Sequence, residues 1–265
     1  MSRTGSEIGG VDVAGPADAA EILFVHGTIF NRTMWAPQRD ALAERFRVIT
    51  PDLPGHGSRT DETFRMGEAL LTIDDVVESM TDGSVHLVGL SLGGYVATEY
   101  ARRYPENVDD LVLSGSSANP VGLLGTLSRL VGKATILASK TGLAERATDW
   151  LAERYVRSRD LRPEHEEEIV DAGFDLRPFG EAGVEIADED FRSALASFPG
   201  RTLVCNGQWD LLMRLGERDH VEAARDASLA VVEGAGHACN LDRPDEYTDT
   251  VDWFVDRAVD VSAAD

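Results

Sequence analysis

Cysteine, lysine and long apolar runs are scarce in this chain of 265 residues, and each scarcity excludes a class of protein. The two cysteines, Cys205 and Cys239, are too few for a disulfide scaffold, and no Cys-x-x-Cys pair or Cys/His cluster predicts a zinc site. We interpret both as free thiols. No apolar run reaches the roughly 18 residues of a membrane span, and the N-terminus lacks an apolar stretch of signal-peptide type. We therefore expect a cytoplasmic protein without a membrane partner.

Basic residues are few beside acidic ones. The chain has 47 acidic and 25 basic residues, a formal net charge of −22, and its only lysines are Lys133 and Lys140. Such a field repels nucleic acid and anionic membranes, so neither is an expected partner. The acids are scattered along the chain instead of forming one tail, which is typical of proteins that work in concentrated salt. We favour this halophilic interpretation over an ordinary acidic cytosolic enzyme.

Short aliphatic and β-branched runs alternate with helical segments. Such near-continuous apolar strands are typical of parallel sheets that are covered on both faces. The predicted strands are residues 22–25, 47–50, 85–88, 111–113, 202–205 and 229–232. The predicted helices are residues 37–45, 67–80, 92–104, 215–225 and 244–258. This alternation predicts a doubly wound, mostly parallel α/β sheet, to which residues 6–13 add an antiparallel edge.

One interval interrupts the alternation of strands and helices. More than 80 residues without a convincing strand separate Ser114 from Arg201. Apolar residues at helical spacing predict one helix between 123 and 137, and two further helices are expected near 150–155 and 164–170. We predict a helical lid at 119–190, inserted into an α/β core formed by 1–118 and 191–265. Insertions at strand carboxyl ends lie where open α/β folds bind ligands, and this apolar stretch hints at an apolar substrate.

The most specific motif is Gly89-Leu90-Ser91-Leu92-Gly93-Gly94, which follows the third predicted strand and opens a predicted helix. A serine nucleophile projects from a tight, strained strand-to-helix turn, where side chains two residues away on either side would collide. Glycines at positions 89 and 93 meet that requirement. A phosphate-binding turn fits less well, because Ser91 stands where that motif needs its middle glycine. We predict Ser91 as a catalytic nucleophile.

Two later strand ends supply the partners that a serine nucleophile needs. Serine is a weak nucleophile on its own and requires a base that is held in place by an acid. His237 follows the last predicted strand on a glycine-rich loop, and Asp210 follows the strand before it. The chain order Ser91, Asp210, His237 matches the order expected for a nucleophile on such a turn. We predict these three residues as catalytic, with Asp52 as the reserve candidate for the acid.

An oxyanion formed at the nucleophile needs two backbone N–H donors. We expect one from Leu92, directly after the nucleophile, and one from Thr28, on the loop after the first predicted strand. Trp35, Trp209 and Met213 are candidates for lining the substrate pocket, although each fits core packing equally well.

The remaining histidines are predicted to be structural. His26 is expected to brace the loop that carries the oxyanion donor, and His56 lies in a Pro-Gly-His-Gly turn. His86 lies in the middle of a predicted strand and is expected in the core. His165 and His220 lie among charged residues and are expected at the surface.

Four motifs together resemble the α/β-hydrolase superfamily. They are His-Gly at 26–27, Asp-Leu-Pro-Gly-His-Gly-Ser at 52–58, the Gly-Leu-Ser-Leu-Gly-Gly turn at 89–94 and Gly-Ala-Gly-His at 234–237. The match covers nearly the whole chain outside the predicted lid. The branch that it most resembles holds small lidded esterases, lactonases, perhydrolases of the non-haem haloperoxidase type and carbon–carbon bond hydrolases. Dehalogenases and epoxide hydrolases of this fold use an aspartate nucleophile, which Ser91 argues against.

The sequence therefore favours a serine hydrolase that cleaves a small carboxylic ester or lactone through an acyl-enzyme, without a metal or organic cofactor. One alternative is a carbon–carbon bond hydrolase or lyase with the same triad. It would need a cationic pocket, for which Arg129 and Arg154 of the predicted lid are candidates. The non-enzyme alternative is a receptor or scaffold with this fold. A small molecule is the expected partner, and no pattern predicts a particular oligomeric state.

Overall fold

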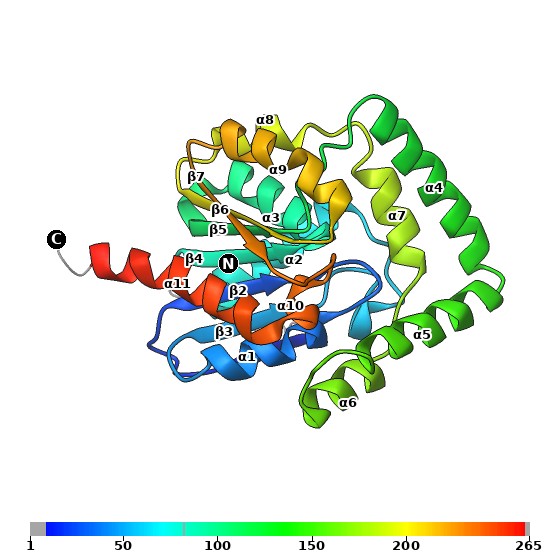
Figure 1. Ribbon diagram of the computed structural model, residues 1–265, viewed down its shortest axis with the longest axis horizontal. Coiled ribbons are helices and arrows are strands. Elements are labelled where there is room, and N and C mark those ends of the chain that lie inside the picture. Colours follow the sequence, from blue (N-terminus) through cyan, green and yellow to red (C-terminus); the bar gives the residue numbers. More distant parts are fainter. Residues whose placement is uncertain (1–8, 82, 263–265) are drawn as a thin grey trace, which may run out of the picture.

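The structure, a computed structural model, describes residues 9–81 and 83–262. Within these residues a seven-stranded sheet runs in the order β1-β3-β2-β4-β5-β6-β7, and all neighbouring strands are parallel except β1 and β3. The strands are β1 (Val11–Ala14), β2 (Glu21–Val25), β3 (Arg47–Pro51), β4 (Val85–Leu90), β5 (Val108–Ser114), β6 (Arg201–Gly207) and β7 (Asp226–Val232). Helices cover both faces of this sheet (Figure 1), which confirms the predicted doubly wound, mostly parallel α/β fold.

Successive residues of the strands enter two different cores, because side chains alternate across a strand. On β2, Ile22 and Phe24 belong to one core cluster, and Leu23 and Val25 belong to the other. The first core is covered by α1 (Ala36–Leu42) and α11 (Pro244–Ser262). The second is covered by α2 (Met66–Met80), α3 (Leu92–Arg103) and α8 (Phe191–Ser197), beside which α9 (Leu211–Ala223) packs. The short helices are η1 (Arg32–Trp35), η2 (Gly57–Arg59), η3 (Pro105–Asn107) and α10 (Cys239–Asp242).

The predicted elements occur in the structure, with some shifted ends. The predicted antiparallel edge is β1, which begins at Val11, and residues 6–8 of that prediction lie outside the described residues. Helix α9 begins at Leu211 instead of 215, directly after the residue predicted as the catalytic acid. This earlier start matters for the site, because it places that acid at the amino end of a helix.

Five helices lie between β5 and β6. The last is α8, and the other four are α4 (Leu123–Ser139), α5 (Leu143–Val156), α6 (Pro163–Asp171) and α7 (Arg177–Glu185). We call these four helices and their connections the insertion. The sequence predicts the first three, but α7 contains Pro178, Gly180 and Gly183, residues of low helix propensity. Its glycines serve the contact with α4, which lies beside α7 (Figure 1). A methyl group on Gly180 would lie 2.7 Å from the carbonyl oxygen of Gly132 on α4, so the two helices touch through their backbones.

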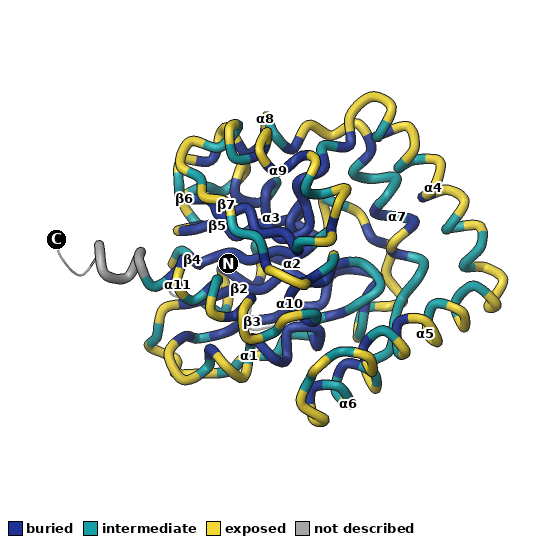
Figure 2. The backbone as a smooth tube through the Cα atoms, viewed as in Figure 1, coloured by how far each residue is buried: buried dark blue, intermediate teal, exposed yellow. Residues whose placement is uncertain are grey.

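The insertion is much less buried than the sheet. Figure 2 shows the central strands as buried, whereas α4, α5 and α6 are largely exposed or half-buried. Five leucine and valine side chains of α4 are exposed, namely Leu123, Leu127, Leu130, Val131 and Leu137. Among residues 9–81 and 83–262, no helix combines the length and the apolar character that crossing a membrane requires.

Candidate active site

Ser91 occupies a strained turn between β4 and α3. Its backbone has φ 55° and ψ −115°, a conformation that L-residues rarely adopt and that is typical of functional turns. The turn is tight enough to exclude side chains around it: a methyl group on Gly89 would lie 2.3 Å from the carbonyl oxygen of Gly93. One on Gly93 would lie 2.0 Å from the carbonyl oxygen of Val25. The Ser91 N–H donates to the carbonyl of Ser114 on β5 at 2.7 Å, which fastens the turn to the sheet.

A continuous chain of hydrogen bonds joins Ser91, His237 and Asp210. Ser91 Oγ lies 2.9 Å from His237 Nε2, and His237 Nδ1 lies 2.6 Å from Asp210 Oδ2. A neutral imidazole that donates from Nδ1 to the carboxylate leaves Nε2 free to accept the serine proton. Asp210 is buried, while the His237 side chain is 46% exposed and open to a reactant. A nucleophile, a base and an orienting acid would need this arrangement.

Close backbone contact brings the Asp210 and His237 loops together. A methyl group on Gly207, at the end of β6, would lie 2.0 Å from the carbonyl oxygen of Gly236. The N–H of Trp209 also donates to the carbonyl of Ala235 at 2.8 Å. Since β6 and β7 are parallel neighbours, their following loops leave the same edge of the sheet. Glycine at both loops lets the acid approach the base.

The loop after β2 carries Thr28 along the edge of the site and is braced by His26. The buried ring of His26 donates from Nδ1 to the carbonyl of Gly27 at 2.8 Å and accepts the N–H of Leu53 at Nε2 at 2.9 Å. Burial lowers the pKa of His26, which keeps the ring neutral and able to accept. Ile29, directly after Thr28, has φ 71°, an unfavourable value for a β-branched residue. The loop is therefore held in one strained conformation beside Ser91.

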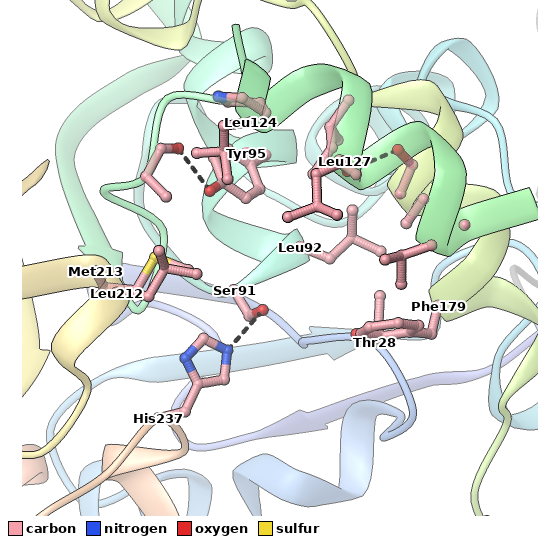
Figure 3. Close-up of a pocket in the computed structure, with 18 of the residues that line it drawn as sticks. Thr28, Ser91, Leu92, Tyr95, Leu124, Leu127, Phe179, Leu212, Met213 and His237 are labelled. Atoms are coloured by element: carbon pink, nitrogen blue, oxygen red, sulfur yellow. Dashed lines mark hydrogen bonds between the residues drawn. The ribbon is translucent and has the colours of Figure 1, made fainter. Parts of the chain in front are cut away.

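A cavity of about 370 Å³ opens beside Ser91 and His237 and is lined mainly by apolar side chains (Figure 3). Thr28 and Leu92 lie on its floor, and Met213 of α9 is on its wall, where sequence reasoning placed a pocket residue. The other apolar walls are contributed by α3, α4, α7 and α9, through Tyr95, Leu124, Leu127, Val131, Phe179, Ile186 and Leu212. The leucine spacing of the helix predicted at 123–137 was the signal for the α4 residues, and no local pattern pointed to Phe179.

Two predicted pocket residues lie outside this cavity. Trp35 is fully buried in the core, with its ring 4.8 Å from the ring of Phe24 and 6.0 Å from that of Tyr247. Its apolar bulk fills the space between β2 and α11 and does not face Ser91. Trp209 precedes Asp210 in the chain but does not line this cavity, and it is 64% exposed. Both placements correct the sequence prediction for this cavity.

The reserve candidates have other partners. Asp52 is buried 2.6 Å from Arg32 Nη1 and also accepts from the N–H and the hydroxyl of Ser58 at 2.9 Å, so its carboxylate braces a turn. Arg129 pairs with Asp188 at 2.9 Å instead of facing the cavity. Arg154 lies over the ring of an exposed tryptophan at 6.0 Å, also away from the cavity. Among the described residues, no three His, Cys, Asp or Glu side chains are grouped as metal ligands.

Comparison with known proteins identifies the family. The chain belongs to the alpha/beta hydrolase family, whose model matches residues 22–250. It is 24% identical to 3-oxoadipate enol-lactonase 1 of Acinetobacter baylyi, over 92% of each chain. It is 28% identical to the pimeloyl-[acyl-carrier protein] methyl ester esterase of Aeromonas hydrophila, over 89% of this chain and 95% of that protein.

Solved structures agree with this assignment. A thermophilic esterase from Thermogutta terrifontis superposes with a TM-score of 0.72 at 25% identity, over 94% of this chain and 93% of the other. MenH from S. aureus superposes with a TM-score of 0.80 at 19% identity, over 94% and 99% of the two chains, which shows the shared fold. The chain is thus a hydrolase of the α/β class, and its relatives include esterases and a lactonase.

Proposed function

We propose that this protein is a serine hydrolase that cleaves small carboxylic esters or lactones through an acyl-enzyme on Ser91, His237 and Asp210. The observation that carries the proposal is the unbroken chain from Ser91 Oγ through His237 to Asp210 Oδ2, with contacts of 2.9 and 2.6 Å, beside an apolar cavity. The names of the enol-lactonase and of the methyl ester esterase support the same reaction class.

The reaction follows from the positions of these groups. His237 Nε2 takes the proton of Ser91 as Oγ attacks the substrate carbonyl, while Asp210 holds Nδ1–H and stabilises the imidazolium. The backbone N–H groups of Leu92, at the start of α3, and of Thr28 bind the oxyanion. His237 then gives its proton to the leaving oxygen, and the acyl group remains on Ser91. Water activated by His237 releases the acid and restores the free serine.

The cavity favours an ester or lactone over a substrate of the carbon–carbon alternative. A carbon–carbon bond hydrolase or lyase that acts on a carboxylate needs a cationic pocket, and the arginines proposed for it, Arg129 and Arg154, point elsewhere. Residues on the cavity wall from α4 and α7 suit an uncharged, apolar acyl group. We assign residues 119–190 as a lid over this cavity and residues 1–118 and 191–265 as the hydrolase core.

The test is turnover of p-nitrophenyl butyrate together with labelling by a fluorophosphonate probe. Ser91→Ala should lower kcat/KM by at least about 10³-fold and abolish labelling, because the nucleophile is lost. Ser79→Ala, which removes an exposed serine on α2, serves as the matched control and should leave both signals unchanged. Assays at about 0.1 M and about 2 M KCl test the halophilic interpretation through screening of the net charge. Retained turnover in Ser91→Ala would contradict the proposal, and a wild-type protein that shows neither turnover nor labelling would favour a receptor or scaffold.

A further inference from the structure

A second depression lies on the other side of His237. It has a volume of about 560 Å³ and is bordered by α5, by the turn before α9 and by the loop that carries His237. We call it the outer groove. Its side chains are Phe30, Leu151, Ala152, Tyr155, Arg159, Trp209, His237, Ala238 and Asp242, with the backbone of Gly234 and Gly236. His237 is the residue that the outer groove shares with the cavity beside Ser91.

Large apolar side chains are left uncovered in the outer groove. Trp209 is 64% exposed and Leu151 is 59% exposed, and the ring of Phe30 lines the same hollow. Single exposed apolar residues are ordinary on protein surfaces, but several around one hollow mark a binding site. Trp209 and His237 line the same groove, so a molecule in the outer groove can contact both side chains.

The polar groups of the outer groove are already paired with one another. Asp242 accepts from Arg159 Nη1 at 2.6 Å, from the hydroxyl of Tyr155 at 2.7 Å and from the N–H of Gly236 at 2.6 Å. The guanidinium of Arg159 also covers the ring of Tyr155 at 4.5 Å. The charges of Arg159 and Asp242 cancel, and Arg159 already covers the face of the Tyr155 ring. An uncharged, apolar occupant fits such a surface.

The proposed reaction indicates which part of an ester lies in the outer groove. In acylation the bond between Ser91 Oγ and the carbonyl carbon forms, and the bond from that carbon to the alcohol oxygen breaks. The proton taken from Ser91 passes through His237 Nε2 to the alcohol oxygen, which must therefore lie within hydrogen-bond reach of that ring. The cavity walls of α4 and α7 lie beside Ser91 and hold the acyl half. The alcohol half, which leaves past His237, extends toward the outer groove.

Resting on the function proposed above, we infer that the outer groove is the leaving-group subsite and that it selects esters of uncharged aromatic alcohols, with Trp209 as the specificity-determining residue. The preferred substrate is then an ester with an apolar acyl half in the cavity and an aryl-methyl alcohol stacked on the indole. This class differs from a lactone, whose leaving oxygen stays tethered to the acyl half and cannot extend into a separate groove.

The experiment compares kcat/KM for benzyl butyrate and methyl butyrate, measured by acid release. The two esters share one acyl group and have unactivated alcohols, and kcat/KM reports the steps up to acylation. Wild-type enzyme should prefer the benzyl ester. Trp209→Ala should lower the benzyl-to-methyl ratio about tenfold, which corresponds to about 1.4 kcal/mol of lost transition-state contact. Trp209→Phe, which keeps a flat ring, should retain most of the preference.

Trp150→Ala is the matched control, because Trp150 is 61% exposed on α5 but does not line the outer groove. Its benzyl-to-methyl ratio should equal that of the wild type. An equal loss for both esters in Trp209→Ala would mean that Trp209 only positions Asp210, and it would overturn the inference. A higher kcat/KM for choline butyrate than for benzyl butyrate would overturn the uncharged class. Failure of the proposed function has a different signature, namely no hydrolysis of either ester and no labelling of Ser91.

Discussion

Helices α3 and α4 both border the cavity beside Ser91, but they are held in opposite ways. Nine of the twelve residues of α3 are buried, and the helix packs on the sheet directly after the nucleophile. Only two of the seventeen residues of α4 are buried, and both are glycines, Gly125 and Gly132, with Gly132 packed against α7. Under the proposed function, the nucleophile thus precedes a buried core helix, whereas part of the cavity wall belongs to a largely exposed helix of the insertion. Chemistry and substrate choice can therefore change separately.

The insertion is fastened to the core at the loop that carries Thr28. The N–H of Asp175 donates to the carbonyl of Ile29 at 2.8 Å, and Asn31 Nδ2 donates to the carbonyl of Gly173 at 3.2 Å. Between these two bonds the rings of Phe30 and Phe174 meet edge to face, 5.5 Å apart. The insertion and the core differ in burial, and this attachment beside Thr28 is one of several that join them.

The largest effect is expected from a single methyl group in the core. Gly93→Ala would place its methyl 2.0 Å from the carbonyl oxygen of Val25, a backbone atom that cannot move without displacing β2. We expect a loss of about 3 kcal/mol or more in the free energy of unfolding and no measurable turnover. Gly67→Ala on α2 is the control, since no atom lies within 4 Å of the added methyl. Urea unfolding measures both variants, and a stable, active Gly93→Ala protein would refute the rigidity of this turn.

The same change in the insertion should alter specificity more than stability. Gly132→Ala would place a methyl 2.5 Å from the carbonyl oxygen of Gly180, which α4 can relieve by moving away from α7. We expect a loss of about 1–2 kcal/mol, retained labelling of Ser91 and a wider cavity. The octanoate-to-butyrate ratio of kcat/KM for p-nitrophenyl esters should then rise several-fold. Leu130→Ala, on the exposed outer side of α4, controls for helix propensity and should leave that ratio unchanged.

The difference between the two regions also explains what the sequence could predict. The strands appear in the sequence as apolar runs because a parallel sheet buries both faces. Gly89 is required by a backbone contact with Gly93, within a few residues of Ser91. Helix α7 was not predicted because its glycines are explained only by α4, which is distant in sequence. Local sequence patterns therefore predict the core strands and the candidate catalytic residues. They do not predict a lightly buried helix such as α7, whose residues are explained by its contact with α4.

Predictions of whether a single side chain is buried are wrong for a related reason. Trp35 and Trp209 are the same residue type, yet Trp35 fills the core and Trp209 is exposed in the outer groove. His165 and His220 are both buried, although their charged neighbours in sequence predict the surface. On a helix, neighbours in sequence point in different directions, so His165 lies 3.0 Å from Asp40 and is buried while the adjacent Glu164 is exposed. The direction in which a side chain points is set by tertiary packing and not by the composition of the neighbouring sequence.

The smallest effect should come from Asp175, at the attachment between insertion and core. Burial raises the pKa of its carboxyl to about 6 from a reference of 3.8, and the negative charges of Glu145 and Asp52 raise it further. The hydrogen bond from the N–H of Gly57 lowers this pKa, but by less. The folded state therefore holds this proton more tightly than the unfolded chain does. Stability attributable to Asp175 is gained as pH falls from about 6 to about 4, and the ionised carboxylate destabilises the fold at neutral pH.

Asp175→Asn removes this titration while keeping an oxygen that accepts the Gly57 N–H. Its melting temperature should exceed that of the wild type by about 2 °C at pH 7.5, a modest shift because the site is partly screened by solvent. The difference should vanish near pH 4, where the wild-type carboxyl is neutral as well. Asp149→Asn, an exposed carboxyl on α5, controls for the loss of one charge from the net −22. If the difference in melting temperature between Asp175→Asn and the wild type stays constant with pH, the carboxyl does not control the attachment. The backbone hydrogen bond between Asp175 and Ile29 would then be what holds it.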